Sequence, residues 1–243
     1  MKLDGKVVII TGAGRGVGRA ISLRFAADGA KVVLAARSEK ELNRVAAEIV
    51  NKDGIAIAVP TDVTVETQVR DMVARTESEL GPVDILVNNA GVMILRPIVE
   101  TTLDEWHRVM NTNLLGAFLC SRAVLPSMMG RRTGRIINIG SMAGRRGYPE
   151  QGVYCASKHG LYGLSKVLAI EGQAYGIRVN VVSPGGALTE LSKDLLATRS
   201  PSEAAEWMTP EQVAEGVYYI ATQDGPGMTD ELVLRRFASE PWR

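Results

Sequence analysis

The chain has 243 residues, of which 46% are hydrophobic and 23% charged, a composition typical of one folded α/β domain. A balance of 28 Lys and Arg against 27 Asp and Glu leaves a net charge of +1, which argues against nucleic acid as a partner. The two cysteines and two histidines lack metal-ligand spacing, so no metal site is expected. With no signal-peptide pattern and no apolar run of about 18 residues, we expect a cytoplasmic protein without a membrane partner.

Taken in chain order, short apolar runs alternate with stretches of helical periodicity. Strands are predicted at residues 7–10, 31–34, 55–59, 85–87, 135–139, 179–182 and 231–234. Helices are predicted at residues 17–28, 39–51, 66–80, 103–129 and 153–175. This alternation favours a parallel sheet with right-handed crossovers. The sequence therefore predicts a single-domain α/β fold over residues 1–243, a doubly wound (Rossmann-type) parallel sheet with helices on both faces. Its ligands should lie beyond the carboxyl ends of the strands.

A glycine-rich turn follows the first predicted strand, in the order Thr11-Gly12-Ala13-Gly14-Arg15-Gly16-Val17-Gly18. Glycines permit a tight turn and let backbone N–H groups approach a pyrophosphate at the start of a helix. The turn is not a P-loop, because no Lys-Ser/Thr pair follows, and Val17 breaks the generic G-x-G-x-x-G spacing. The alternative is a tight turn with ordinary helix packing.

Five further motifs follow this T-G-x-x-x-G-x-G pattern in order. They are Asn88-Asn89-Ala90-Gly91, Asn113, Ser141, Tyr154-x-x-x-Lys158, and Pro184-Gly185 through Thr189. In order and spacing the chain resembles the short-chain dehydrogenase/reductase family from Gly5 to about Thr189. The resemblance implies a nicotinamide dinucleotide held by Gly12, Arg15, Gly16, Val17, Gly18, Arg37, Asp62, Val63, Asn89, Ala90, Gly91, Tyr154, Lys158, Pro184, Gly185 and Thr189.

The end of the second predicted strand favours NADP(H) over NAD(H). An acidic residue about twenty positions after the glycines would accept from the ribose 2′-hydroxyl, but Ala36 stands there and Arg37 follows. Arg37 and Arg15 are suited to a 2′-phosphate, as in the NADP-preferring members of the family; the alternative is two solvated arginines. Glu39 is the only nearby acid and is interpreted as a first-turn helix residue. Asp62, beside the adenine by resemblance, is otherwise the N-cap of the next helix.

Tyr154 and Lys158 lie four residues apart on a predicted helix, so phenol and ammonium share one face. A Tyr pKa lowered from about 10 to neutrality requires about 4 kcal/mol. One positive charge at about 4 Å supplies that much at an effective dielectric constant near 20. We therefore expect Lys158, assisted by an oxidised nicotinamide, to lower the Tyr154 pKa, so that Tyr154 acts as general acid or base.

By resemblance, Ser141 holds the substrate oxygen and Asn113 anchors a water and proton path to Lys158. Each member of this tetrad also has a structural interpretation. The Tyr-Lys pair is otherwise amphipathic surface, Ser141 a cap of the following loop, and Asn113 the partner of a buried backbone group.

The resulting hypothesis is an NADPH-dependent oxidoreductase that interconverts a ketone or aldehyde and an alcohol. One alternative is a 3-oxoacyl-carrier-protein reductase, with Arg131 and Arg132 as basic surface for an acidic carrier; Tyr175 weakens it, since such reductases tend to carry a cation there. A catalytically silent dinucleotide sensor is disfavoured because Tyr154 and Lys158 remain. A methyltransferase is disfavoured by Arg37 and the Asn-Ala-Gly segment.

Substrate selection is expected in loops beyond the strands, at residues 93–95, 142–150 and a substrate loop of about 188–209. The carboxyl-terminal sequence departs from the family's usual glycine-rich ending, since Arg235-Arg236-Phe237 follows the last predicted strand. By resemblance, the long apolar faces of helices 103–129 and 153–175 pair across a two-fold axis into a dimer or tetramer.

Overall fold

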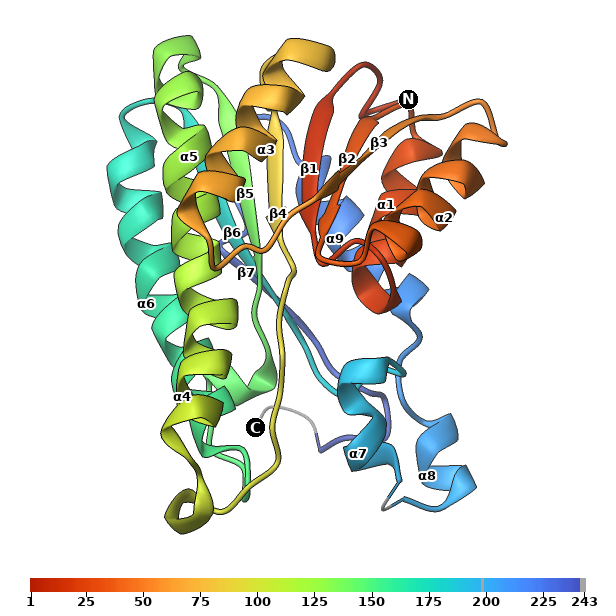
Figure 1. The fold of residues 1–243 in the computed structure, drawn as a ribbon, viewed down its shortest axis with the longest axis vertical. Helices are drawn as coiled ribbons and strands as arrows, with labels where there is room; N and C mark the ends of the chain where they lie inside the picture. The colour runs from red at the N-terminus through yellow and green to blue at the C-terminus, as the bar shows by residue number, and fades with distance from the viewer. Residues whose placement is uncertain (198, 241–243) are drawn as a thin grey trace.

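A computed structural model describes residues 1–197 and 199–240 of the chain; the domain predicted over residues 1–243 thus includes four positions outside the described residues. It contains one seven-stranded parallel sheet in the order β3-β2-β1-β4-β5-β6-β7 (Figure 1). The strands are β1 (Val7–Thr11), β2 (Lys31–Ala36), β3 (Ile55–Pro60), β4 (Ile85–Asn88), β5 (Gly134–Ile139), β6 (Ile177–Pro184) and β7 (Glu231–Leu234). The predicted doubly wound α/β class is confirmed.

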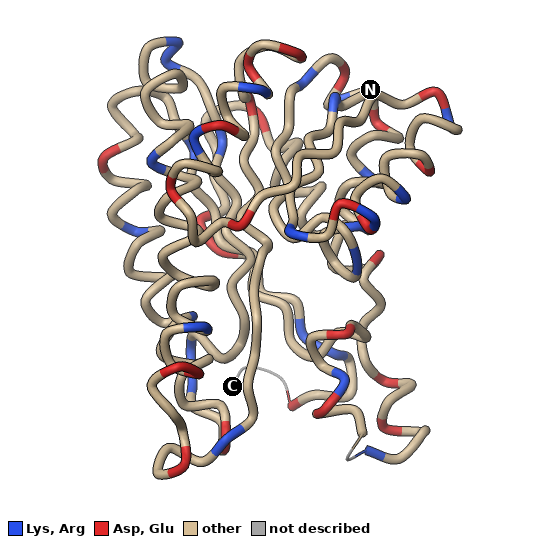
Figure 2. The backbone as a smooth tube through the Cα atoms, in the orientation of Figure 1, with Lys and Arg blue, Asp and Glu red and all other residues tan. Residues whose placement is uncertain are grey.

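Helices cover both faces of the sheet (Figure 1). One face packs against α1 (Gly16–Ala26), α2 (Glu39–Val50) and α9 (Pro210–Ala221), and the other against α3 (Glu66–Glu79), α5 (Gly116–Arg131) and α6 (Gly152–Gln173). Alternation along β1 shows how one strand serves both cores: Val8 and Ile10 join the first and Ile9 the second, all fully buried. Basic and acidic residues are interspersed over the helices, in keeping with the net charge of +1 (Figure 2).

The helix predicted at residues 103–129 is divided into three parts. It begins as α4 (Leu103–Met110), passes through a π-helical turn (Asn111–Leu115) and continues as α5. The π turn adds a residue without ending the helix, so the apolar periodicity of the sequence does not reveal it. Its one buried side chain is that of Asn113, and such turns are frequent at functional sites.

Helix α9 was not predicted, although it has clear sequence signals. Thr209 and Gln212 form a capping box with Pro210 at the first turn, and Val213, Val217 and Ile220 are buried. The predicted substrate loop, of which position 198 lies outside the described residues, contains the short helices α7 (Lys193–Leu196) and α8 (Pro201–Ala205). Both lie beyond the carboxyl ends of the strands, on the side away from α4 (Figure 1). In the described part of the chain, no helix is long and apolar enough to span a membrane.

Candidate active site

A cavity of about 1450 Å³ lies at the carboxyl ends of the strands. It is larger than the roughly 300–1,000 Å³ of ordinary small-molecule pockets. Apart from Asn113, every cofactor or catalytic residue expected from the sequence lines it: Gly12, Arg15, Gly16, Val17, Gly18, Arg37, Asp62, Val63, Asn89, Ala90, Gly91, Ser141, Tyr154, Lys158, Pro184, Gly185 and Thr189. The parallel strands bring together residues that are far apart in the sequence, because all seven strands end at the same edge.

The glycine-rich turn requires glycine at particular positions. Gly12 and Gly16 have φ of +66° and +53°, which L residues rarely adopt. A Cβ on Gly18 would lie 2.2 Å from the carbonyl oxygen of Gly12, so α1 begins in close contact with the end of β1. Gly16 and Gly18 add no side chain of their own to the first turn of α1, which lines the cavity and is suited to a pyrophosphate.

Thr11 and Asn89 join this turn to the loop after β4. The Thr11 hydroxyl oxygen accepts from the backbone N–H groups of Asn89 and Ala90, both at 3.0 Å. In return, the Asn89 side-chain amide donates to the carbonyl oxygens of Thr11 at 2.9 Å and Gly12 at 3.3 Å. The Asn-Ala-Gly segment thereby fixes the position of the turn.

Arg15 and Arg37 both line the cavity and are exposed, at the place where a 2′-phosphate is expected. The expectation that Glu39 is the only nearby acid is wrong. Glu41 lies against Gly14, lines the cavity and forms an ion pair with Arg15 at 3.8 Å. Distance along the chain did not indicate which acid lies at the cavity. Glu41 is on the face of α2 that lines the cavity, whereas Glu39 does not line it.

Asp62 does not cap α3, contrary to one of the two interpretations above. Val65 occupies the N-cap position, and the Asp62 carboxylate instead accepts from the backbone N–H of Thr64 at 2.9 Å and its hydroxyl at 2.7 Å. The carboxylate therefore holds a turn before the helix, and this turn places Asp62 and Val63 at the cavity wall.

The Asn113 side chain is buried behind the cavity wall. Its amide nitrogen donates to the Val92 carbonyl at 2.9 Å and the Ser157 hydroxyl at 3.0 Å, and its amide oxygen accepts from the Val92 N–H at 2.8 Å. Ser157 in turn donates to the Tyr154 carbonyl at 2.7 Å. The Asn113 amide thus fixes the loop after β4 to α6; the contacts of its side chain do not include Lys158.

Tyr154 and Lys158 lie one turn apart on α6 and are 7% and 5% exposed. The Lys158 ammonium donates to the Ile139 carbonyl at 2.8 Å and lies 5.7 Å from the centre of the Tyr154 ring. Burial lowers the pKa of Lys158 to about 8 and raises the pKa of Tyr154 to about 12, although a hydrogen bond with Ser141 acts in the opposite direction. For the protein alone, desolvation of the phenol is the largest cause and raises the Tyr154 pKa; the lowering expected with an oxidised nicotinamide bound stays a prediction.

Ser141 begins a 3₁₀ turn (Met142–Gly144) immediately after β5. Its hydroxyl oxygen accepts from the Ala143 N–H at 3.1 Å, so it caps this turn while remaining within hydrogen-bonding reach of Tyr154. The structural and functional interpretations of Ser141 are compatible, since a hydroxyl both donates and accepts.

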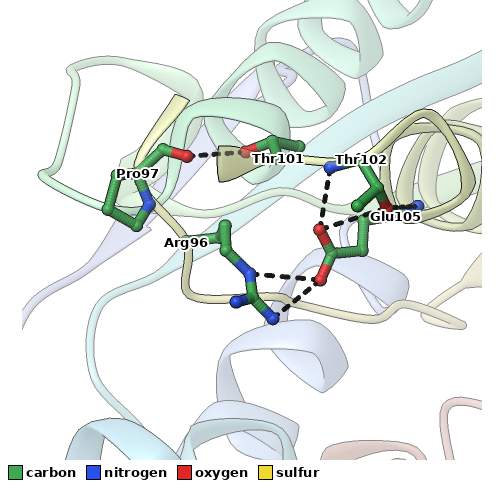
Figure 3. Close-up of polar contacts among 5 residues, drawn as sticks. All are labelled: Arg96, Pro97, Thr101, Thr102 and Glu105. Atoms are coloured by element: carbon green, nitrogen blue, oxygen red, sulfur yellow. Dashed lines mark hydrogen bonds and ion pairs between the residues drawn. The ribbon is translucent and has the colours of Figure 1, made fainter. Parts of the chain in front are cut away.

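The loop after β4 is attached to α4 at its far end by Arg96 (Figure 3). Nε and Nη2 of Arg96 donate to one oxygen of Glu105 at 3.2 and 3.0 Å, while the other oxygen accepts from the Thr102 N–H at 3.0 Å. The Arg96 N–H also donates to the Glu150 carbonyl at 2.7 Å. Arg96 thus connects two predicted substrate loops, residues 93–95 and 142–150.

Arg131 and Arg132 lie away from the cavity, at the amino ends of the strands. Arg131 donates to the Val83 carbonyl and pairs with Asp84 at 3.6 Å, just before β4, while Arg132 donates to the Ala174 carbonyl at 2.7 Å. Both guanidinium groups are engaged within this chain, at the opposite end of the sheet from Tyr154. The structure therefore gives no support to the basic carrier surface expected at this pair.

Trp207, Arg235 and Arg236 also line the cavity, and no site role was predicted for the two arginines. Trp207 lies in the predicted substrate loop, but its indole packs on Gly186, where a Cβ would approach the ring to 2.8 Å. The two arginines follow β7, whose parallel pairing with β6 brings the chain to the cavity edge. The position of the two arginines could not be predicted without α9, because α9 is the crossover helix that returns the chain to the sheet.

Comparison with known proteins agrees with this arrangement. A family model described as short chain dehydrogenase matches residues 6–200. A 3-oxoacyl-[acyl-carrier-protein] reductase from Synechocystis sp. is 38% identical over 90% of this chain and 90% of its own, and one from Haemophilus influenzae is 37% identical over 93% and 95%. The chain belongs to the short-chain dehydrogenase/reductase family.

Solved structures give the same result. A short-chain type dehydrogenase/reductase from Mycobacterium marinum has a TM-score of 0.90 at 35% identity, covering 96% of this chain and 95% of its own. A metagenomic short-chain oxidoreductase in complex with NADP has a TM-score of 0.84 at 33% identity, covering 97% and 99%. An actinorhodin polyketide ketoreductase variant with NADPH has a TM-score of 0.87 at 32% identity, covering 97% and 96%.

Proposed function

We propose that this protein is an NADPH-dependent reductase that converts a ketone or aldehyde into an alcohol. The observation that carries the proposal is the convergence of a glycine cradle, two arginines and the Ser141-Tyr154-Lys158 group in one cavity. When bound, NADPH supplies a hydride to the carbonyl carbon. The protein positions the substrate oxygen and supplies the proton.

The proposed cofactor site is formed by segments at the carboxyl ends of β1, β2, β3, β4 and β6. The backbone at Gly12, Gly16 and Gly18 fits the pyrophosphate, and Arg15 and Arg37 fit a 2′-phosphate. The short-chain oxidoreductase and the ketoreductase in the comparison have NADP and NADPH bound. Asp62 and Val63 would flank the adenine. Pro184, Gly185 and Thr189 would contact the nicotinamide end, as would the Asn89-Ala90-Gly91 segment and Val17.

The proton step uses the buried pair on α6. Ser141 donates a hydrogen bond to the carbonyl oxygen, and Tyr154 donates its phenolic proton to that oxygen as the hydride reaches carbon, giving the alcohol. Hydride plus proton account for both hydrogens added across the carbonyl bond. Lys158 opposes charge accumulation on the phenolate that remains, and Asn113 acts as a positioning residue for α6 through Ser157.

The substrate is proposed to lie between the loops at residues 93–95, 142–150 and 188–209. A 3-oxoacyl thioester is the second candidate, because two of the relatives are named 3-oxoacyl-[acyl-carrier-protein] reductases. The position of Arg131 and Arg132 argues against docking of a carrier protein at that pair. Cys120 and Cys155 are free and buried, which is compatible with a reducing cytosol.

We also propose that the chain forms a dimer or tetramer through α4, α5 and α6. Large apolar side chains are exposed on these helices, with Val167 51% and Ile170 74% exposed on α6, and Phe118 37% exposed on α5. A face of this kind is favourable to bury against a second copy across a two-fold axis.

NADPH oxidation over a panel of ketones, quinones, sugars and 3-oxoacyl thioesters tests the function, with Tyr154→Phe as the diagnostic variant. Loss of the proton donor should reduce kcat by about 10²–10⁴-fold, with NADPH binding retained, as followed by cofactor fluorescence. Tyr219→Phe, which changes an exposed tyrosine outside the cavity, is the matched control. Undiminished turnover by Tyr154→Phe would refute the mechanism.

A further inference from the structure

The last described residues, 235–240, form a wall of the cavity and are referred to as the carboxyl-terminal tail. Arg235, Arg236, Ser239 and Glu240 line the cavity. The tail leaves the sheet beside the proposed nicotinamide site, since the Gly185 N–H donates to the Leu234 carbonyl at 2.7 Å. Nη1 of Arg235 donates to the carbonyls of Arg236, Phe237 and Ser239 at 3.0, 2.9 and 2.7 Å. This guanidinium holds the tail in a defined turn.

Arg236 is held in place by an aromatic ring. Its guanidinium carbon lies 5.3 Å from the centre of the Trp207 ring, within the range of a cation–π contact. Trp207 is itself fixed against Gly186, and its neighbour Met208 donates an N–H to the Gly186 carbonyl at 3.1 Å. A cation–π contact positions a charge without neutralising it, so Arg236 presents a full positive charge to the cavity.

Three other arginines that line the cavity have side-chain partners, whereas the exposed Arg108 on α4 lines it with no ion pair among the described residues. Arg145 pairs with Glu231 at 3.9 Å, Arg199 with Glu203 at 3.6 Å, and Arg146 donates to the Tyr148 hydroxyl at 2.7 Å. Within residues 1–197 and 199–240, no carboxylate forms an ion pair with Arg236, although Glu190, Asp194 and Glu240 also line the cavity. Figure 2 shows that both basic and acidic residues occur along α4 and α7.

The half-buried Arg236 guanidinium has no counter-ion among the described residues. It is a ready partner for an anion, because partial desolvation strengthens a charge-assisted hydrogen bond. We propose that the carbonyl substrate carries an anionic group and that Arg236 binds this group while the carbonyl faces Tyr154. The inference rests on the proposed reductase function and adds its substrate class. The anion is either the carboxylate of a free oxo acid or a phosphate of a phosphopantetheine thioester.

Two pairs of substrates, each differing in charge, test the proposal. The first pair is an oxo acid and its methyl ester, and the second is a 3-oxoacyl-coenzyme A and the N-acetylcysteamine thioester of the same acyl group. In at least one pair, wild type should favour the anionic member by about tenfold to hundredfold in kcat/KM, the range of a charge-assisted hydrogen bond. The pair in which this preference occurs identifies the anion.

Arg236→Gln should remove most of the preference in that pair, and Arg236→Lys should retain the larger part because it keeps the charge. Arg75→Gln, which removes an exposed arginine paired with Glu79 outside the cavity, should leave the preference unchanged. Raising the ionic strength should also weaken the wild-type preference, a measurement that needs no variant. Circular dichroism establishes whether each variant is folded.

Equal kcat/KM for the two members of both pairs in wild type would overturn the inference and leave the reductase function intact. A preference that Arg236→Gln leaves unchanged would overturn it as well. No NADPH oxidation with any of the four compounds, while another carbonyl compound of the panel is reduced, would overturn the inference alone. No NADPH oxidation with any member of the panel would overturn the proposed function as well.

Discussion

The Tyr154 phenol and the Lys158 ammonium show how burial acts against two ionisable side chains at once. Each loses hydration on folding, so the charged form of each is disfavoured: the pKa of the phenol rises to about 12 and that of the ammonium falls to about 8. A tyrosine that holds its proton firmly is a poor base but is fully protonated before reduction. In the protein alone the site is therefore set for proton donation.

The lowered pKa of Lys158 predicts a pH dependence of stability. Between pH 8 and about 10.5, the unfolded chain still binds the proton that the folded protein has lost, so the free energy of unfolding rises with pH. Tyr154 acts in the opposite direction only above about pH 10, its ordinary pKa. Below pH 8 the ammonium is charged in both states and its burial cost is fully present.

Urea unfolding of the cofactor-free protein at several pH values from 7.5 to 10 measures this effect. Relative to Lys158→Met, wild type should gain at most about 1.4 kcal/mol of unfolding free energy per pH unit, the limit for one proton. Parallel pH profiles for the two proteins would contradict the prediction.

Arg37 and Glu41 predict opposite changes in cofactor affinity. Arg37→Asp places a negative charge where the 2′-phosphate is proposed, so the preference for NADPH over NADH should fall at least about tenfold. Glu41→Gln releases Arg15 from its 3.8 Å ion pair, so NADPH should bind several-fold more tightly. Dissociation constants for both cofactors, from fluorescence titration, measure these changes. An unaltered preference in Arg37→Asp would refute the assignment.

At the level of elements, the loops around the cavity are fixed by a small number of polar contacts. The Asn113 amide connects the π turn, the loop after β4 and α6, and the Arg96 guanidinium connects that loop to α4 and to the segment before α6. Motif spacing located Asn113 in the sequence, but no sequence signal indicated Arg96. Its contacts depend on a loop conformation that periodicity does not determine.

Arg96→Ala should change the position of the loop after β4 without much change in the free energy of unfolding. The Arg96–Glu105 pair is partly exposed, with side chains 46% and 21% exposed, so its loss should change the unfolding free energy by less than about 1 kcal/mol. Release of the loop at residues 93–102 should raise the KM for the substrate several-fold and leave kcat nearly unchanged. Arg75→Ala breaks an exposed ion pair with Glu79 away from the cavity and is the control. A KM equal to that of wild type would contradict this account.

For the whole molecule, the chain order of strands and helices was sufficient to predict the fold. Buried runs such as Val7 to Ile10 identified the strands, and the Gly-rich turn identified where β1 meets α1. The cavity wall beyond residue 189 was not predictable in the same way. Its parts, Trp207 and Arg236, come together only after α9 has crossed the sheet face, a contact between segments with no shared motif.

The exposed face of α5 and α6 predicts an oligomer that a single charge can disrupt. Ile170→Glu would place an unpaired carboxylate in the proposed two-fold interface, which is strongly unfavourable, so the assembly should dissociate into smaller species. Ile55→Glu, on the edge strand β3 with its side chain 48% exposed, should leave the assembly intact. Light scattering coupled to size-exclusion chromatography gives the masses. A wild-type mass equal to one chain would contradict the proposed oligomer.

The first and the last residues that the structure describes lie in different surroundings. Near the amino terminus, Leu3 and Gly5 bond to Asp28 and Gly29 at the amino ends of the strands, far from the cavity, whereas Ser239 and Glu240 line the cavity itself. An affinity tag fused to the carboxyl-terminal side of Glu240 would therefore obstruct the entrance of the cavity. The same tag placed before Met1 would not. The end of the chain chosen for a purification tag should therefore affect the kcat and KM that are measured for this protein.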